Sequence, residues 1–207
     1  MESYEVLNEA QEFSETDPFT LERYKQFFSH FSKPGMAVLD VGCNTGRGGR
    51  LLKSLDPSVH LIGLDCVKGR LDRIEVGIYQ SKLCSYSTDI SLNDSSVDAI
   101  VAGEFIEHLY LKDVEQSLRE FYRVLKAGGR LQLTTPNPGY IRLKLTRGSV
   151  LGGAHVSQHE PIELKRRLEQ IGFTNIRICG SGKMTRILGE SFFPLALYGS
   201  YLVIADK

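Results

Sequence analysis

The stretch AVLDVGCNTG, residues Ala37–Gly46, is the part of the sequence from which the fold can be predicted. Apolar residues lead into Asp40, and a glycine-spaced turn then opens onto the amphipathic run Arg47–Leu55. This order predicts a buried strand, a tight turn and the start of a helix. Glycines let the backbone approach a ligand, and a helix start leaves free N–H groups beside it. Asp40, at the carboxyl end of the strand, is expected to accept hydrogen bonds from an amine or a hydroxyl of that ligand.

The spacing of the turn separates two classes of cofactor. A dinucleotide-binding turn has the pattern G-x-G-x-x-G and wraps a pyrophosphate, whereas this chain has Asp40-x-Gly42-x-Asn44-x-Gly46. The pattern resembles motif I of the class I S-adenosylmethionine-dependent methyltransferases, of the type 11/12-like kind that includes ubiquinone-pathway O-methyltransferases. The resemblance implies that Asp40, Gly42, Asn44 and Gly46 lie against the methionine part of the cofactor. Taken alone, such a turn is equally typical of a plain strand-to-helix connection.

A second acid follows at the end of the next predicted strand, His60–Asp65. Asp65 comes 19 residues after Gly46, and an acid at that place can accept hydrogen bonds from both ribose hydroxyls. The alternative is a solvated acid at a strand end. The resemblance implies three further contacts to the adenine: Cys66 beside it, Asp89 on its amino group and Ile90 against the ring.

The order of the remaining elements predicts the fold. Strands alternate with helices, which favours a parallel sheet with helices on both faces. The last two strands lack an intervening helix and can therefore pair antiparallel. We expect an α/β, doubly wound, seven-stranded and mostly parallel sheet with an antiparallel last strand, the Rossmann-like methyltransferase fold. Besides the two strands above, strands are predicted at 83–88, 97–102, 130–135, 175–179 and 201–205, with helices at 113–125 and 163–171.

At 207 residues the chain is long enough for one α/β domain and short for two. Residues 35–207 are expected to form the class I methyltransferase domain, and residues 1–34 an N-terminal helical cap. Aromatic residues recur at helical spacing within that cap. They indicate either packing against the domain or a cover over the ligand cleft. The four residues are Tyr24, Phe27, Phe28 and Phe31.

The charge balance and the cysteine content limit which binding partners and which cellular compartment are expected. Lys plus Arg and Asp plus Glu both number 25, so no overall field attracts nucleic acid or anionic lipid. The four cysteines are scattered without a C-x-x-C pair and fit reduced thiols. The chain begins without a signal-peptide pattern, and no apolar run reaches membrane-spanning length. We therefore expect a cytoplasmic protein with a small-molecule acceptor and no membrane partner. Oligomeric state has no signature in this sequence.

The segment after the predicted fourth strand carries the reactive groups, in the pattern Glu104-x-x-Glu107-His108. Methyl transfer to a hydroxyl requires removal of its proton by a base or by a Lewis-acid metal. If a helical turn begins near Glu104, the three side chains share a face. Together they could bind a divalent cation such as magnesium, manganese or zinc. The alternative is that Glu107 and His108 merely start a helix, where the dipole favours an acid.

The pattern E-x-x-E-H also resembles the ubiquinone-pathway O-methyltransferases and the small-RNA 2′-O-methyltransferases. In both families a histidine in the loop after the fifth strand completes the site. The loop Pro136–Glu160 holds His155 and His159, and the family pattern favours His155. The resemblance thus implies Glu107, His108 and His155 as catalytic residues, the same three with Glu104 as metal ligands, and Glu104 also as a cofactor contact.

We expect an S-adenosylmethionine-dependent methyltransferase that acts on a hydroxyl of a small molecule. One alternative is 2′-O-methylation of RNA 3′ ends, for which Arg142, Lys144 and Arg147 could meet phosphates, although zero net charge disfavours it. Another is a non-catalytic module that keeps the cofactor pocket. The sequence distinguishes neither the acceptor nor O- from N- or C-methylation.

Overall fold

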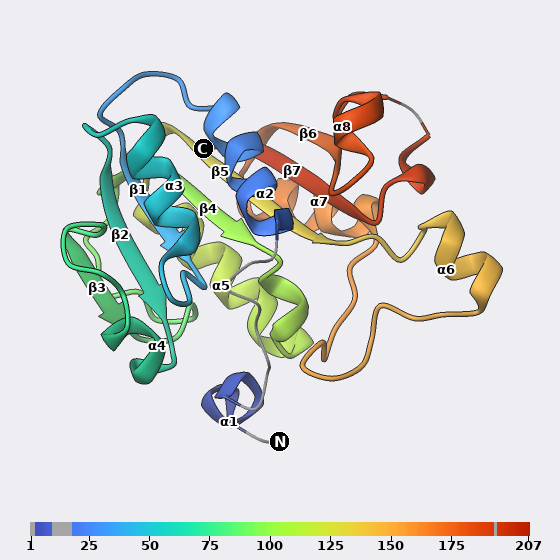
Figure 1. Cartoon of the computed structure of the whole chain (residues 1–207), viewed down its shortest axis with the longest axis horizontal. Coiled ribbons are helices and arrows are strands. Elements are labelled where there is room, and N and C mark those ends of the chain that lie inside the picture. The colour runs from blue at the N-terminus through green and yellow to red at the C-terminus, as the bar shows by residue number, and fades with distance from the viewer. Residues whose placement is uncertain (1–2, 10–17, 193) are drawn as a thin grey trace.

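The apolar run that precedes the glycine turn forms β1 (Ala37–Val41), which lies inside a seven-stranded sheet. The computed structural model describes residues 3–9, 18–192 and 194–207 (Figure 1). The sheet has the order β3-β2-β1-β4-β5-β7-β6. β7 runs antiparallel to both of its neighbours, and the other pairs are parallel. The predicted fold class is confirmed. The remaining strands are β2 (His60–Asp65), β3 (Ser81–Cys84), β4 (Val97–Gly103), β5 (Leu125–Pro136), β6 (Thr174–Ser181) and β7 (Ser200–Asp206).

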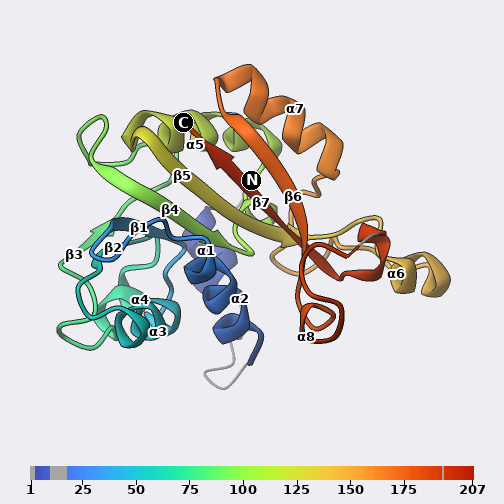
Figure 2. The ribbon, with the colours of Figure 1, turned by 90° about the horizontal axis from the view of Figure 1, so that it is seen from above.

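Helices cover both faces of the sheet (Figure 2). α5 and α7 lie on one face, where Leu118 and Phe121 are fully buried. α2, α3 and α4 lie on the other face, over a second core that includes Phe27 and Leu52. The central strands are buried on both sides, which explains their nearly continuous apolar sequence. The helices are α1 (Tyr4–Glu9), α2 (Pro18–Ser29), α3 (Arg47–Leu55), α4 (Lys68–Asp72), α5 (Leu111–Val124), α6 (Ile141–Thr146), α7 (Pro161–Ile171) and α8 (Thr185–Leu188), with 3₁₀ turns η1 (Ile106–His108) and η2 (Leu195–Leu197).

Three predicted segments differ from the structure. The connection between β6 and β7, predicted to lack a helix, contains the short helix α8 and the 3₁₀ turn η2. α8 has only four residues, too few to show a helical period in the sequence. β3 ends at Cys84, so the second half of the predicted strand 83–88 is a loop. The pattern misled there because β3 is an edge strand with mostly exposed side chains and little apolar alternation. The predicted loop 136–160 contains α6, which projects at the right of Figure 1. α6 has no buried residue and Leu145 is 78% exposed, so no apolar period marks it in the sequence.

The N-terminal helices attach to the domain in two places. On α2, Tyr24 and Phe27 are buried in the core against α3 and the sheet. Phe28 of α2 and Phe31, just beyond its end, pack at the edge of that core. On α1, the Tyr4 hydroxyl bonds the carboxylate of Asp113 and accepts the N–H of Tyr110. Residues 1–2 and 10–17 of the predicted cap lie outside the described residues. No helix of the described chain is both long and apolar enough to cross a membrane.

Candidate functional site

The turn between β1 and α3 has the backbone geometry that its glycines predict. Gly42 and Gly46 have positive φ angles of 68° and 82°, and Asn44 joins them at 52°. The N–H groups of Gly42 and Cys43 donate to the carbonyl of Leu64 at 2.8 and 3.1 Å, which ties the turn to the end of β2. A side chain at Gly42 would place its Cβ 2.8 Å from the ring of Phe105. Glycine is therefore required at position 42 by both conformation and space.

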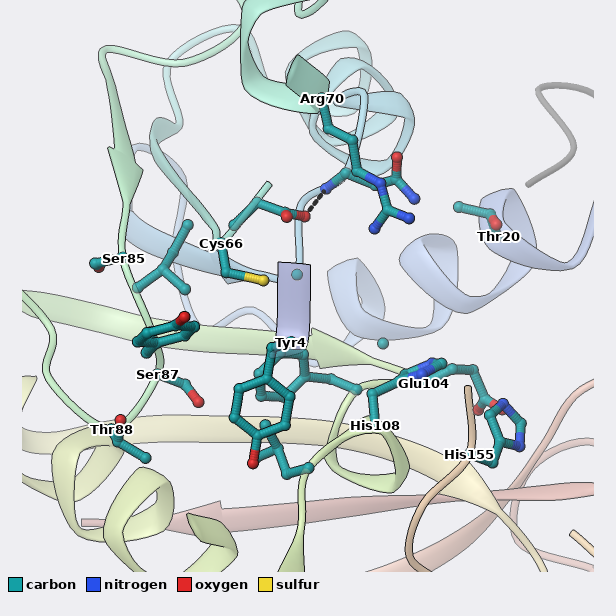
Figure 3. Close-up of a pocket in the computed structure, with 18 of the residues that line it drawn as sticks. Tyr4, Thr20, Cys66, Arg70, Ser85, Ser87, Thr88, Glu104, His108 and His155 are labelled. Carbon is teal, nitrogen blue, oxygen red and sulfur yellow. Dashed lines mark hydrogen bonds between the residues drawn. The ribbon is translucent and has the colours of Figure 1, made fainter. Parts of the chain in front are cut away.

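A cavity of about 340 Å³ opens at the carboxyl ends of β1, β2 and β4, a size in the range of small-molecule sites. Figure 3 shows its two sides: Cys66, Ser85 and Thr88 on one, Glu104 and His155 on the other. Every strand that contributes a wall ends here, as expected for an open α/β sheet. The lining residues are Tyr4, Thr20, Arg23, Gly42, Asn44, Leu64, Asp65, Cys66, Arg70, Ser85, Tyr86, Ser87, Thr88, Gly103, Glu104, Phe105, His108, Leu109 and His155.

Asp65 is held rigidly at the wall of this cavity. Its Oδ2 accepts the N–H of Asn44 and its Oδ1 accepts the N–H of Val67, both at 2.9 Å. The carboxyl is only 5% exposed, and burial raises its pKa against the lowering effect of these hydrogen bonds. Of the predicted cofactor contacts, Gly42, Asn44, Asp65, Cys66 and Glu104 line the cavity.

The other four predicted cofactor contacts do not line it. Asp40 is fully buried behind the turn, where both carboxylate oxygens accept tyrosine hydroxyls. Gly46 caps α3, Asp89 is exposed, and Ile90 is part of the core. Because β3 ends at Cys84, the loop of residues 85–88 lines the cavity on the side where Asp89 and Ile90 were expected, and the adenine contacts of those two residues remain predictions.

Three cavity residues from the N-terminal helices were missed by sequence reasoning. Tyr4 comes from α1, and Thr20 and Arg23 from α2. The only available signal was the spacing of Thr20 and Arg23 with Tyr24, which places all three on one side of a helix. α2 therefore packs on the core through its aromatic residues and also borders the cavity.

Glu104 does not begin a helical turn as predicted. Its φ angle is 50°, in the left-handed region, and its N–H donates to the carbonyl and Oγ1 of Thr134 at 3.0 and 3.1 Å. The turn starts at Ile106 instead, so the expected common face for Glu104, Glu107 and His108 is wrong. The Glu104 Oε1 is buried and accepts no hydrogen bond, and the Nε of Arg23 lies 3.7 Å from it.

Glu107 points into the protein below the histidines. It is 1% exposed, its Oε2 accepts the Thr135 hydroxyl at 3.0 Å, and its buried Oε1 has no hydrogen-bond partner. Burial, followed by the nearby charge of Glu104, raises the pKa of Glu107 well above its usual value. A carboxylate in this position needs a proton or a cation to balance it.

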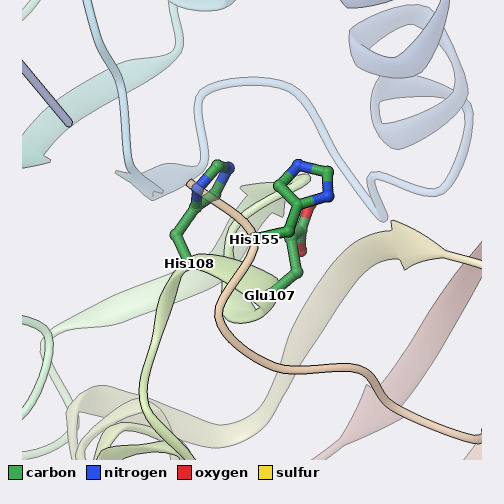
Figure 4. Close-up of side chains that lie close together, drawn as sticks. All are labelled: Glu107, His108 and His155. Atoms are coloured by element: carbon green, nitrogen blue, oxygen red, sulfur yellow. The ribbon is translucent and has the colours of Figure 1, made fainter. Parts of the chain in front are cut away.

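Glu107, His108 and His155 lie close together (Figure 4). We refer to these three residues as the histidine cluster. One ligand atom from each lies within 4.8 Å of the others, and the two rings are 4.9 Å apart. The Nδ1 of His108 is 3.1 Å from the carbonyl of Ala154, and that of His155 is 2.9 Å from the carbonyl of Val150. A carbonyl only accepts, so each Nδ1 carries a proton and donates it to that carbonyl.

Burial, together with the neighbouring His155, lowers the pKa of His108 to about 4, so its imidazole is neutral near pH 7. A neutral imidazole held by a backbone carbonyl suits either a metal ligand or a general base. Within the described residues, the histidine cluster leaves out Glu104. It also leaves out His159, whose Nε2 contacts the Ser157 hydroxyl at 2.9 Å and the Ile106 carbonyl at 3.3 Å. Of the two loop histidines, His155 is the one that joins the cluster.

Comparison with known proteins shows which family this sequence resembles. The family model described as a methyltransferase domain matches residues 39–133. A Mycobacterium tuberculosis protein named as a probable S-adenosylmethionine-dependent methyltransferase is 32% identical over 69% of this chain and 50% of its own length. The chain belongs to the class I S-adenosylmethionine-dependent methyltransferases. This confirms the family that the motifs predicted.

Two further relatives show how much of this chain, and how much of its relatives, the similarity covers. The mitochondrial ubiquinone biosynthesis O-methyltransferase of Rattus norvegicus is 29% identical over 70% of this chain and 46% of its own length. The crystal structure of a SAM-dependent methyltransferase from Archaeoglobus fulgidus superposes with a TM-score of 0.72, over 90% of this chain and 92% of that one, at 22% identity. The chain thus spans about half the length of the curated relatives it matches. The segment that the family model matches, residues 39–133, includes the glycine turn and Glu107, whereas His155 and α2 lie outside it.

Proposed function

We propose that this methyltransferase transfers the methyl group of S-adenosylmethionine to a hydroxyl of a small molecule. The observation that carries the proposal is the make-up of one cavity. Asp65 lies in its wall, and His108 and His155 border it with their Nδ1 atoms bonded to backbone carbonyls. Asp65 suits the nucleoside of the cofactor, and the two histidines suit removal of a proton from a hydroxyl. The cofactor and the acceptor would therefore meet between Asp65 and the histidines.

The residues of the cavity fit the cofactor. Asp65 is a fixed double acceptor for the two ribose hydroxyls, with Cys66 beside it. The methionine part carries an ammonium and a carboxylate. The buried Oε1 of Glu104, which accepts no hydrogen bond, suits the ammonium, and the guanidinium of Arg23 suits the carboxylate.

The histidine cluster fits a divalent cation. Glu107 offers an oxygen without a hydrogen-bond partner, and both histidines offer Nε2 while backbone carbonyls hold Nδ1. Two nitrogens and one oxygen suit zinc or manganese better than magnesium. A cation held by these three residues would lower the pKa of the acceptor hydroxyl. We propose it as an alternative to direct proton removal by the Nε2 of His108.

The residues around the cluster keep these groups aligned for an in-line displacement. Thr135 fixes the carboxylate of Glu107, and the bonds to Ala154 and Val150 fix the planes of the two imidazoles. Fixed orientation is the main contribution that a protein makes to a displacement between two bound molecules. The loop that carries His155 must therefore stay folded for the acceptor to be activated.

The proposed activity can be tested directly. The protein is incubated with methyl-labelled S-adenosylmethionine and separate pools of phenols, aliphatic alcohols, amines and carbon acids, and labelled products are identified by mass spectrometry. We expect product only in a hydroxyl pool, and a loss of about 100-fold or more in rate for His108→Gln. Product in the amine pool alone would contradict O-methylation. Cofactor binding without any product would favour a non-catalytic module.

Binding of RNA is expected to be weak. Arg142, Lys144 and Arg147 are exposed at α6, but three phosphate contacts give a slope of only about −2 in log affinity against log salt for a single strand. Fluorescence anisotropy with a labelled single-stranded RNA should give a dissociation constant above about 1 μM at physiological salt. The triple substitution of these residues by glutamine serves as the control. Submicromolar binding with a steeper slope would favour RNA as the acceptor.

A further inference from the structure

Asp40 holds two tyrosine side chains from separate parts of the chain. The hydroxyl of Tyr24, on α2, donates to its Oδ1, and that of Tyr79, between α4 and β3, donates to its Oδ2, both at 2.5 Å. All three side chains are buried. Burial raises the pKa of Asp40 to about 7, although the hydrogen bonds from the two tyrosine hydroxyls act to lower it. The acid that begins the glycine turn is therefore occupied inside the protein and does not face the cavity.

Two consecutive glycines in the first turn of α3 make room for these rings. A Cβ at Gly48 would lie 2.1 Å from the ring of Tyr24, and a Cβ at Gly49 would lie 2.3 Å from the hydroxyl oxygen of Tyr79. Each glycine in a helix costs about 1 kcal/mol relative to alanine. Both have φ angles outside the left-handed region, so backbone conformation does not require them. The space for the tyrosines explains why the helix carries them.

Tyr24 links the glycine turn to one wall of the cavity. On α2 it follows Thr20 by four residues and Arg23 by one, and both of those line the cavity. Thr20 neighbours both Arg23 and Tyr24 on the helix surface, because they follow it by three and four residues. Tyr79 makes the matching hydrogen bond to the same carboxylate, but it is not on α2 and does not line the cavity.

We propose that Tyr24 is a positioning residue, which docks α2 on Asp40 and thereby holds Arg23 and Thr20 against the bound cofactor. The inference rests on the proposed use of S-adenosylmethionine at this site. Asp40 then acts through Tyr24 and not by contact with the cofactor. Tyr79 occupies the second oxygen of Asp40 and stabilises the domain without shaping the cavity.

The test compares Tyr24→Phe with its matched control Tyr79→Phe. Each removes one hydroxyl from the same carboxylate and leaves the ring in its glycine space. Both variants should lose similar thermal stability. By calorimetry below their melting temperatures, Tyr24→Phe should bind S-adenosylmethionine about 10-fold more weakly than wild type, and Tyr79→Phe within about threefold of it. Equal losses in the two variants, or unchanged binding by Tyr24→Phe, would overturn the proposal.

A second measurement needs no variant. In the wild-type protein, S-adenosylmethionine should slow hydrogen exchange of the amides of α2, and unchanged exchange across α2 would contradict the coupling. Gly48→Ala should mimic Tyr24→Phe in cofactor affinity, because its Cβ displaces the ring while every hydrogen-bonding group remains. If wild type fails to bind S-adenosylmethionine, the proposed function falls and this inference with it. Wild-type binding with an unaffected Tyr24→Phe removes the inference alone.

Discussion

Asp65→Ala is expected to bind S-adenosylmethionine about 10- to 150-fold more weakly than wild type, the range for hydrogen bonds to a charged group of about 1.5 to 3 kcal/mol. The carboxylate is positioned by the N–H groups of Asn44 and Val67. Its loss removes the ribose acceptors and also releases the glycine turn. Titration calorimetry measures the effect, with thermal unfolding as the check that the variant is folded.

Asp89→Ala is the control for this experiment. Asp89 is exposed and does not line the cavity, so its replacement should change the affinity by less than about threefold. A large loss at Asp89 with no loss at Asp65 would mean that the nucleoside binds elsewhere. It would also restore the adenine contact that the motif alone implies for Asp89.

The second large effect concerns the histidine cluster. If a cation is bound, exhaustive chelation should reduce turnover by about 100-fold or more, and zinc, manganese or magnesium should restore it. Glu107→Gln removes the charge but keeps an acceptor for Thr135. It should abolish the metal dependence and leave cofactor affinity nearly intact, because the proposed ribose contact lies elsewhere in the cavity.

His155→Ala and His60→Ala separate the two models of proton removal. His155 belongs to the histidine cluster, whereas His60 is an exposed residue at the start of β2. Metal content after dialysis against zinc should fall in His155→Ala and stay at the wild-type level in His60→Ala. Full activity after chelation, together with its loss in His108→Gln, would leave the imidazole base as the operative model. That result would not change the assignment of the chain to the methyltransferase family.

The fold was predictable where strands are covered on both faces. The sequences of β1 and β4 are short apolar runs because helices pack on both faces of these strands. The prediction was least accurate where a segment buries little. β3 lies at an edge of the sheet, and α6 projects from the domain, so neither leaves an apolar period in the sequence.

The site was predictable where chemistry follows a strand end. Asp65 ends β2 and His108 comes after β4, and the carboxyl ends of both parallel strands reach the cavity. Arg23 was missed because α2 precedes the sheet in sequence and reaches the cavity only through tertiary packing. The two hydrogen bonds to Asp40 could not be predicted for the same reason, since both tyrosines that donate to it are distant in sequence.

The position of β7 has a consequence for how the protein is made. β7 is the last strand along the chain, yet it lies between β5 and β6. A nascent chain that has emerged only through β6 therefore has an unpaired edge at β5 and no partner for β6. Such edges are prone to pairing with other chains. The sheet closes only when residues 200–206 insert between β5 and β6, so until then two strand edges stay open to pairing with other chains.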